Sequence, residues 1–476
     1  MQDPFIERLQ RAVGKHACLS TPAQLLVYEC DGLTHFRTLP RAVVLPSTTE
    51  EVQSIVRICR EERVPFTPRG AGTGLSGGAT ASPGGILIEL SKMNRILAID
   101  ADSRTAVVQP GVINSHLSDA VNHLGLHYAP DPSSQTACSL GGNVAENAGG
   151  PHGLKYGSTE RHVLAVKVVT ADGDAFSMGH PTGAFHGLDL RGLFLGSEGT
   201  LGIATELTVR LTPNPEVTET VLAPFRGLRP ACEAVSAVIA AGIVASALEA
   251  LDDRTIAAVE ASVFRAGYPT DAGAVLLLEF DGSEEDVVES VSRTRAILVE
   301  HNAMSVTTTR DPEQRKVLWR GRKGAFGAMG RLAPDLYVQD AVVPRTKLPD
   351  VLEHVGAICD RYRLRLANVF HAGDGNLHPN ISYDGRDPDE VERVILAGRE
   401  IIEACLRVGG TLSGEHGIGL EKQEFMPLLF TAADLDAMKR VRDVFDPVHI
   451  MNPGKVLPTP RACVEVRRPK PLGATP

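Results

Sequence analysis

The sequence predicts an α+β protein with two main domains, because short apolar runs alternate with amphipathic segments along most of its 476 residues. At roughly 100–200 residues per domain, this length allows two to four domains. Residues 212–215, Thr-Pro-Asn-Pro, cannot continue a helix or a central strand and therefore predict a domain boundary. We expect an N-terminal helical segment over 1–39, a first domain over 40–213, a second domain over 214–420, a C-terminal helical segment over 421–458 that returns to the first domain, and a tail over 459–476.

The individual elements follow from short apolar runs bounded by turn residues. In the first domain, strands are expected over residues 41–46, 86–90, 106–109, 165–170 and 203–211. Residues 47–50 and the overlapping 48–51 each offer a capping box ahead of a helix. The Asp-Gly pair at 172–173 predicts a hairpin turn. In the second domain, we expect strands over 274–280, 337–343 and 367–370 and helices near 284–301, 347–362 and 387–408.

Composition and charge exclude several classes of protein. The 58 Asp and Glu residues against 48 Lys and Arg give a net charge of −10, which argues against a nucleic-acid or anionic-lipid surface. The longest uncharged apolar run, residues 234–248, is shorter than the ~20 residues of a spanning helix and predicts a buried helix and strand. Eight scattered cysteines form no zinc or iron–sulfur motif, and the first residues lack the apolar core of a secretory signal. We therefore expect a soluble, cytoplasmic chain with no membrane span.

Three loops of small and polar residues indicate a long, polar cofactor in the first domain. The first loop, residues 68–78, contains Gly-x-Gly-x-x-Gly, but the segment that follows it cannot open the helix of a Rossmann nucleotide site. Its glycines still allow backbone N–H groups to surround a phosphate or pyrophosphate. The other loops are residues 130–150 and 196–202. Together the three loops favour a dinucleotide.

These loops, PRGAGTGLSGG, PDPSSQTACSLGGNVAENAGGPHGLKYG and GSEGTLGI, resemble the FAD-binding domain of the vanillyl-alcohol-oxidase/p-cresol-methylhydroxylase flavoproteins. The resemblance implies a two-lobed FAD-binding domain followed by an α+β substrate (cap) domain. Residues at 69–76 would surround the pyrophosphate, those at 132–147 the flavin and ribityl chain, and those at 198–203 the adenosine half. The residues expected to bind FAD are Pro68, Arg69, Gly70, Ala71, Gly72, Thr73, Gly74, Leu75, Ser76, Pro132, Ser133, Thr136, Gly141, Gly142, Ala145, Asn147, Gly150, Glu198, Gly199, Gly202, Ile203 and Asn452.

The same resemblance bears on how FAD is attached. Relatives that tether the flavin covalently use a histidine or a cysteine, and the glycine loop at 68–78 contains neither. Noncovalent FAD is therefore expected. His152, two residues after the second loop, leaves a histidine contact with the flavin open.

Two histidines in the second domain predict a shared metal site. Within residues 368–380, the Asp-Gly pair at 374–375 lies between apolar runs and predicts a two-residue hairpin turn. Such a turn would place His371 directly opposite His378, with Cβ atoms ~5 Å apart. Two imidazoles at that separation can bind one metal ion.

A second loop, residues 413–419 (SGEHGIG), could bring Glu415 to these histidines as a third ligand. Two histidines, one glutamate and open positions are typical of catalytic metal sites. HAGDGNLHPN, SGEHGIG and MNPGK also resemble the branch of the family that oxidises 2-hydroxy acids. The resemblance implies that His371, His378 and Glu415 bind a divalent metal ion, either zinc, manganese or iron.

The branch resemblance implies roles for three further residues. His416 would be the catalytic base, a task that suits the histidine pKa of ~6.5, and Arg322 would bind the substrate carboxylate bidentately. Asn380 would orient the substrate or a ligand histidine. The basic neighbours of Arg322 are expected on solvated helix faces; they are Arg320, Lys323 and Arg331.

The implied reaction oxidises a small 2-hydroxy acid to the 2-oxo acid by hydride transfer to FAD, with glycolate favoured and D-lactate as the alternative. A lysine that dicarboxylate-oxidising relatives carry near residues 337–339 is absent, which disfavours a dicarboxylate. Electrons would pass to a quinone or a partner. The resemblance implies a second FAD-type subunit and an iron–sulfur subunit, through which the chain would lie peripherally at the inner membrane. A stand-alone D-lactate dehydrogenase and a catalytically silent FAD-binding scaffold remain alternatives.

Overall fold

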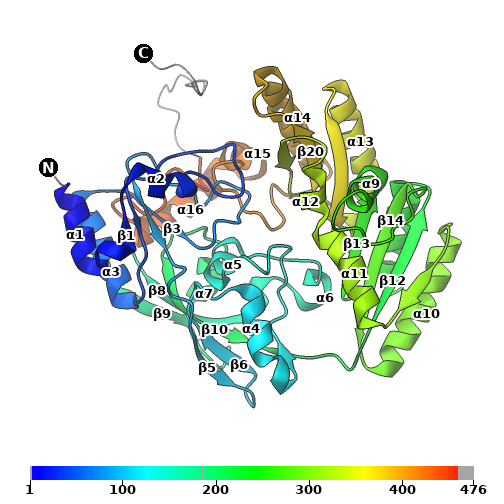
Figure 1. Ribbon diagram of the computed structural model, residues 1–476, viewed down its shortest axis with the longest axis horizontal. Helices are drawn as coiled ribbons and strands as arrows, with labels where there is room; N and C mark the ends of the chain where they lie inside the picture. Colours follow the sequence, from blue (N-terminus) through cyan, green and yellow to red (C-terminus); the bar gives the residue numbers. More distant parts are fainter. Residues whose placement is uncertain (1–2, 185–186, 459–476) are drawn as a thin grey trace.

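The computed structural model describes residues 3–184 and 187–458, which form two lobes (Figure 1). The tail expected over 459–476 lies outside these described residues. In each lobe, helices cover sheets whose strand pairs are antiparallel, except for two parallel pairs in one sheet of the first lobe. This is the predicted α+β class.

The first lobe contains a four-stranded and a five-stranded sheet. The four-stranded sheet has the order β1 (Cys18–Leu19), β2 (Val43–Val44), β4 (Ile86–Glu89), β3 (Phe66–Arg69). The antiparallel five-stranded sheet has the order β5 (Ile96–Asp100), β6 (Thr105–Val108), β10 (Ile203–Arg210), β8 (Val163–Val169), β9 (Ala175–Gly179). A short pair joins β7 (Leu126–His127) to β11 (Thr212–Pro213). The α-helices are α1 (Pro4–Val13), α2 (Pro22–Leu25), α3 (Thr49–Glu62), α4 (Asn114–Val121), α5 (Leu140–Glu146), α6 (Gly153–Tyr156) and α7 (Leu190–Phe194).

The strands predicted for this lobe are confirmed, with bounds that differ by a few residues. Helix α3 begins at the second of its two predicted caps, where Thr48 Oγ accepts a hydrogen bond from Glu51 N at 3.2 Å. Its apolar face packs in the core of the four-stranded sheet. The predicted turn between β8 and β9 contains Gly173 at φ +78°, a conformation that glycine adopts without strain.

The second lobe is built on a nine-stranded sheet. Its order is β15 (Thr307–Thr309), β12 (Val217–Phe225), β14 (Ala274–Gly282), β13 (Ala247–Asp252), β18 (Arg365–His371), β19 (Asn376–Leu377), β17 (Ala341–Val342), while β20 (Pro379–Tyr383) pairs with β18 and with β16 (Asp335–Val338). The α-helices are α8 (Leu228–Ala240), α9 (Asp253–Glu260), α10 (Glu284–Glu300), α11 (Pro312–Lys323), α12 (Ala325–Met329), α13 (Leu348–Arg361) and α14 (Pro388–Arg407). The predicted helices and the strands over 274–280 and 367–370 are confirmed.

Alternation along the central strands sends neighbouring side chains into different layers. On β13, Leu248 and Ala250 enter the core formed with α8, α10, α13 and α14. Glu249, between them, therefore lies on the opposite face, and it is directly opposite His371 in the pairing of β13 with β18. The apolar run over 234–248 is confirmed as a buried helix and strand, the end of α8 and the start of β13.

Two expectations for this lobe are wrong. His371 pairs with Asn376, so the hairpin loop contains the four residues 372–375 rather than two, and His378 is a diagonal neighbour of His371 on the same face. The strand expected over 337–343 is divided into β16 and β17. The interruption falls at Gln339 and Asp340, and the Asp340 carboxylate accepts hydrogen bonds from a distant loop.

After the second lobe, the chain runs back beside the N-terminal elements, and α15 (Met426–Leu429) and α16 (Ala432–Phe445) lie there in Figure 1. Met451 then forms a parallel bridge with Phe66 on β3. Across the described residues, no helix combines the length and the apolarity needed to cross a membrane.

Candidate active site

One cavity joins the two lobes, and most of the residues predicted from the motifs line it. The three glycine-rich loops of the first lobe contribute one part of its wall, and Arg322 with the histidine motifs contributes another. The predicted residues in the lining are Pro68, Arg69, Gly70, Ala71, Gly72, Thr73, Gly74, Leu75, Pro132, Ser133, Gly141, Gly142, Ala145, Glu198, Gly199, Gly202, Ile203, Arg322, His371, His378, Glu415 and His416. Those that lie outside it are Ser76, Thr136, Asn147, Gly150, Asn380 and Asn452.

Some of the residues outside the lining support the wall from behind. Asn452 Nδ2 donates to the carbonyl oxygens of Gly78 and Glu198, at 3.1 and 2.7 Å, and so ties two loops together. Asn380 Nδ2 donates to the backbone oxygen of His378 at 2.6 Å. Thr136 is exposed, and its position offers no contact with the cavity.

The glycine loop is shaped for close approach by a ligand. Gly72 has φ +70°, a conformation that side chains rarely adopt. A Cβ on Gly74 would have only the Glu146 carboxylate near it, at 4.0 Å, and so would project into open space. A polar cofactor can therefore lie against bare backbone here, which fits FAD.

His371, His378 and Glu415 form a compact donor set. Glu415 Oε1 lies 3.2 Å from Nε2 of His371 and 3.2 Å from Nε2 of His378. The Nδ1 of His371 faces Glu249 Oε1 at 2.7 Å, and the Nδ1 of His378 faces the carbonyl of Gln339 at 3.4 Å. Because both Nδ1 atoms face acceptors, each ring can keep a proton on Nδ1 and offer Nε2, on the side of Glu415, to a cation. Three acceptors that converge in this way fit a divalent cation.

Asp340 holds the loop that carries Glu415 and His416. Its Oδ2 accepts hydrogen bonds from the backbone N–H groups of Gly414, Glu415 and His416, at 2.9, 3.2 and 3.0 Å. Burial alone would raise the pKa of this carboxyl, but neighbouring positive charge, which includes the Lys422 ammonium, holds it far below its usual range. The glycine-flanked loop is thus fixed by one buried anion.

His416 stacks on His378, with ring centroids 5.0 Å apart and planes inclined by 10°. Burial lowers the pKa of His416 to about 4, so its imidazole is neutral near pH 7. Among the described residues, its buried Nδ1 has no hydrogen-bond partner. A neutral ring with a free nitrogen at a cavity wall is able to accept a proton.

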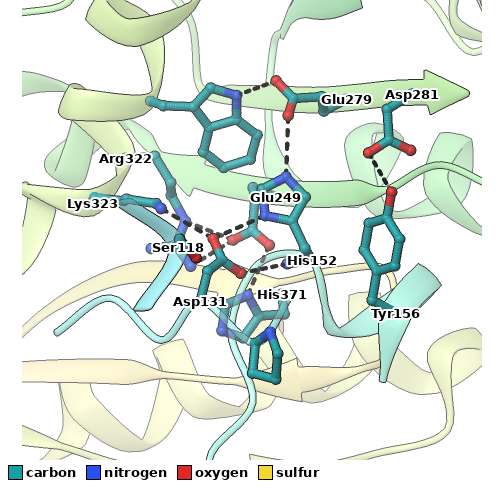
Figure 2. Close-up of polar contacts among 12 residues, drawn as sticks. Ser118, Asp131, His152, Tyr156, Glu249, Glu279, Asp281, Arg322, Lys323 and His371 are labelled. Atoms are coloured by element: carbon teal, nitrogen blue, oxygen red, sulfur yellow. Dashed lines mark hydrogen bonds and ion pairs between the residues drawn. The ribbon is translucent and has the colours of Figure 1, made fainter. Parts of the chain in front are cut away.

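Arg322 enters the cavity from the last turn of α11, where it is fully buried. Glu249 Oε2 accepts from its Nε at 2.6 Å and lies 2.5 Å from its Nη2 (Figure 2). Nη1 is buried and makes no hydrogen bond within the described part of the chain. This guanidinium therefore keeps donor capacity for an anion in the cavity.

Lys323 and His152 belong to a second polar network between the lobes (Figure 2). Asp131 accepts from Lys323 Nζ at 3.0 Å and from His152 Nδ1 at 2.9 Å, while His152 Nε2 lies 3.1 Å from Glu279. Burial would lower the pKa of His152, but the two carboxylates raise it to about 10. The expectation that Lys323 is a solvated helix-face residue is wrong, because it is paired with Asp131 and lines the cavity.

Three functional carboxylates were not predicted: Glu249, Glu279 and Asp340. Each interrupts an apolar strand segment, and each is buried, with 0–4% of its surface exposed. Charged residues are almost never fully buried unless they are paired. An acidic residue inside an apolar strand segment therefore indicates a buried, paired carboxylate, although the sequence does not identify the residue that pairs with it.

Both halves of the chain match known families. Residues 40–179 match "FAD binding domain", and residues 214–456 match "FAD linked oxidases, C-terminal domain". The chain belongs to the FAD-linked oxidase family. The predicted resemblance to FAD-binding oxidoreductases is thus confirmed, and FAD is the cofactor that this family binds.

Known relatives of this FAD-linked oxidase extend over nearly its whole length. The glycolate oxidase subunit GlcD of Escherichia coli (strain K12) is 47% identical over 447 residues, which are 94% of this chain and 89% of the relative. A D-lactate dehydrogenase of Anaerostipes hadrus is 34% identical over 88% of this chain and 89% of its own. The structure of p-cresol methylhydroxylase with substrate bound aligns with a TM-score of 0.81 at 19% identity, over 95% of this chain and 96% of the other. That structural likeness confirms the fold.

Proposed function

We propose that this FAD-linked oxidase converts a small 2-hydroxy acid, glycolate in the first instance, into the 2-oxo acid. The observation that carries the proposal is the convergence on one cavity of Arg322, the donor set of His371, His378 and Glu415, and the neutral ring of His416. A 2-hydroxy acid offers one group to each: a carboxylate, a hydroxyl oxygen and a hydroxyl proton. The identity to a glycolate oxidase subunit supports the choice of glycolate.

In this proposal each side chain has one task. Arg322 binds the substrate carboxylate through the donors that Glu249 leaves free, which fixes the orientation of the substrate. His371, His378 and Glu415 hold a divalent cation, zinc, manganese or iron, which supplies Lewis-acid polarisation of the hydroxyl when bound. His416 accepts the hydroxyl proton. Asn380 keeps the backbone of His378 in place.

The glycine loops and Glu198 would hold FAD, which supplies the hydride acceptor when bound. We propose that the attachment is noncovalent. His152 is not in the cavity lining, and both of its ring nitrogens are engaged by carboxylates. Neither nitrogen is available to form a bond to the flavin.

The proposal is tested with the purified, FAD-loaded protein under anaerobic conditions. Glycolate should bleach the flavin absorbance, and His416→Ala should slow bleaching by about two orders of magnitude with unchanged flavin content. His354→Ala, an exposed histidine on α13, is the matched control and should bleach at the normal rate. If no 2-hydroxy acid bleaches the flavin, the chain is a silent scaffold instead.

D-lactate is the second candidate substrate, because a D-lactate dehydrogenase matches the chain over most of its length. We further propose that electrons leave for a quinone or for partner subunits, one of the FAD type and one with iron–sulfur clusters, at the cytoplasmic side of the inner membrane. The sequence identity to a protein that is itself a subunit of glycolate oxidase supports the proposal of partner subunits. Full dye-linked turnover of D-lactate by the isolated chain, above that of glycolate, would replace the glycolate proposal with a stand-alone D-lactate dehydrogenase.

A further inference from the structure

Glu249 contacts two parts of the candidate site at once. Its Oε1 lies 2.7 Å from His371 Nδ1, and its Oε2 lies 2.6 Å from Arg322 Nε (Figure 2). The three side chains are at most 4% exposed. One carboxylate group therefore lies between a residue of the metal donor set and the residue assigned to the substrate carboxylate.

The fold explains why one residue can reach both. The register of β13 against β18 pairs Glu249 directly with His371, so their side chains are neighbours on one face of the sheet. Arg322 arrives on the same face from the last turn of α11. A shift of one residue in this register would turn Glu249 to the opposite face.

The carboxylate also determines the tautomer of His371. An ionised carboxylate only accepts hydrogen bonds, so Glu249 holds a proton on Nδ1 of His371 and leaves Nε2, which faces Glu415, as the nitrogen that can bind a cation. Histidine ligands commonly donate their second N–H to a carboxylate in this way. The other oxygen of the same group accepts from Arg322 and orients its guanidinium.

We propose that Glu249 is a positioning residue that sets the metal-binding tautomer of His371 and the orientation of Arg322 together, so that the cation subsite and the carboxylate subsite depend on one shared anion. The inference rests on the proposed function. It adds a residue to that site for which the motifs provide no indication.

An amide at this position can serve only one partner. In Glu249→Gln, the single carbonyl oxygen can accept either from Arg322 or from His371, and the NH₂ group must face the other. Arg322 is charged and is the stronger donor, so the carbonyl is expected to turn toward it. The NH₂ group would then move the His371 proton to Nε2, the nitrogen that the cation needs.

The test measures binding rather than turnover, with Mn²⁺ and acetate as probes. Mn²⁺ affinity is measured by electron paramagnetic resonance on chelator-treated, FAD-loaded protein, and acetate affinity by calorimetry on the metal-free protein. Glu249→Gln should weaken Mn²⁺ binding about 10–100-fold. Glu219→Gln is the matched control: Glu219 is a buried, arginine-paired carboxylate on β12 of the same sheet that contacts neither His371 nor Arg322, and the variant should leave Mn²⁺ affinity unchanged.

Two further variants separate positioning from a general loss of structure. In Glu249→Gln/Arg322→Gln, the amide carbonyl is released to accept from His371, so Mn²⁺ affinity should recover while acetate binding is lost. Glu249→Asp keeps the counter-charge of the buried Arg322, and so protects the fold, but is one methylene too short to reach both partners. It should weaken binding of Mn²⁺, of acetate or of both by at least about tenfold.

Wild-type affinity for both probes in Glu249→Gln and Glu249→Asp would overturn the inference. It would also be overturned by an equal loss of Mn²⁺ affinity in Glu219→Gln, or by no recovery in the double variant. A wild-type protein that binds no Mn²⁺ would overturn the proposed metal centre as well, which distinguishes that failure from one confined to Glu249.

Discussion

At the scale of single residues, the candidate site depends on buried carboxylates that accept hydrogen bonds from several donors. Asp340 has 0% of its surface exposed and receives three backbone N–H groups, as well as the hydroxyl of Ser413 at 2.5 Å. Such bonds to a charged acceptor are stronger than neutral ones. A loop rich in glycine is thereby held in one conformation beside His378.

Asp340→Asn is expected to destabilise this loop and the fold. An asparagine loses the charge and offers one acceptor oxygen, while the buried Lys422 loses the nearer of its two carboxylate neighbours, Asp340 at 3.4 Å, and keeps Glu421 at 3.8 Å. We expect the free energy of unfolding to fall by about 3–5 kcal/mol, measured by denaturant titration. Hydrogen exchange at the amides of residues 414–416 should accelerate. The exposed Asp436→Asn on α16 serves as the control, and equal stability of the two variants would contradict this role of Asp340.

At the scale of elements, the cofactor loops rely on helix caps that leave no room for extra atoms. Ser139 is the N-cap of α5, the helix that carries Gly141 and Gly142, and its Oγ accepts from Gly142 N at 3.3 Å. A Cβ on Gly70 would lie only 2.3 Å from that Oγ. The glycine loop and the start of α5 are thus packed against each other through a cap.

Gly70→Ala is therefore expected to weaken FAD binding. The added methyl group must displace Ser139 from its cap or move the glycine loop, and a lost cap costs about 1 kcal/mol. A cost of this size corresponds to at least a fivefold loss of FAD affinity. Fluorescence titration of the apoprotein with FAD measures it. Gly356→Ala, at a position in α13 where nothing lies within 4 Å of the new Cβ, should bind FAD normally. Equal affinities would show that the cap is not coupled to the cofactor.

The register of paired strands also belongs to the scale of elements. The Asp-Gly pair at 374–375 favours a two-residue turn, yet the loop has four residues because the pairing of β18 with β20 sets the register from the other end of the hairpin. The two registers differ by an even number of residues. His371 and His378 therefore stay on one face, as predicted, although they are diagonal rather than direct neighbours.

At the scale of the whole molecule, charged groups join the two lobes around the cavity. His152 and Asp131 belong to the first lobe, and Glu279 and Lys323 belong to the second. Tyr156 adds a hydroxyl bond to Asp281 across the same boundary at 2.8 Å (Figure 2). The relative position of the FAD loops and the catalytic residues thus depends on ionised partners.

The stability of this junction should depend on pH with a definite sign. The pKa of His152 is raised to about 10 from an ordinary value of 6.5, so its contribution is complete below pH 6.5 and is lost as the pH rises through 10. The pKa of Glu279 is lowered to about 2, since the charged His152 outweighs its burial, so its contribution is complete above pH 4.5 and is lost in acid. The junction is therefore most stable between about pH 4.5 and 6.5.

The measurement is the free energy of unfolding of the wild type and of His152→Gln from pH 6 to 10. The difference between the two should shrink as the pH rises, because only the wild type loses a charged partner. His449→Gln, at an exposed histidine, controls for histidine titration in general. A difference that stays constant over this range would contradict an ionised His152.

The sequence by itself determined the features that depend on local spacing: the glycine loops, the capped helix after Thr48, the paired histidines and the Glu-His pair at 415–416. These signals are contained within a few residues, where backbone conformation and side-chain chemistry are decided locally. Tertiary structure alone decided which groups meet. Glu249 reaches His371 across 122 positions and Arg322 across 73, through strand register and helix packing. A buried charge selects its partner by long-range geometry, and no short motif contains that information.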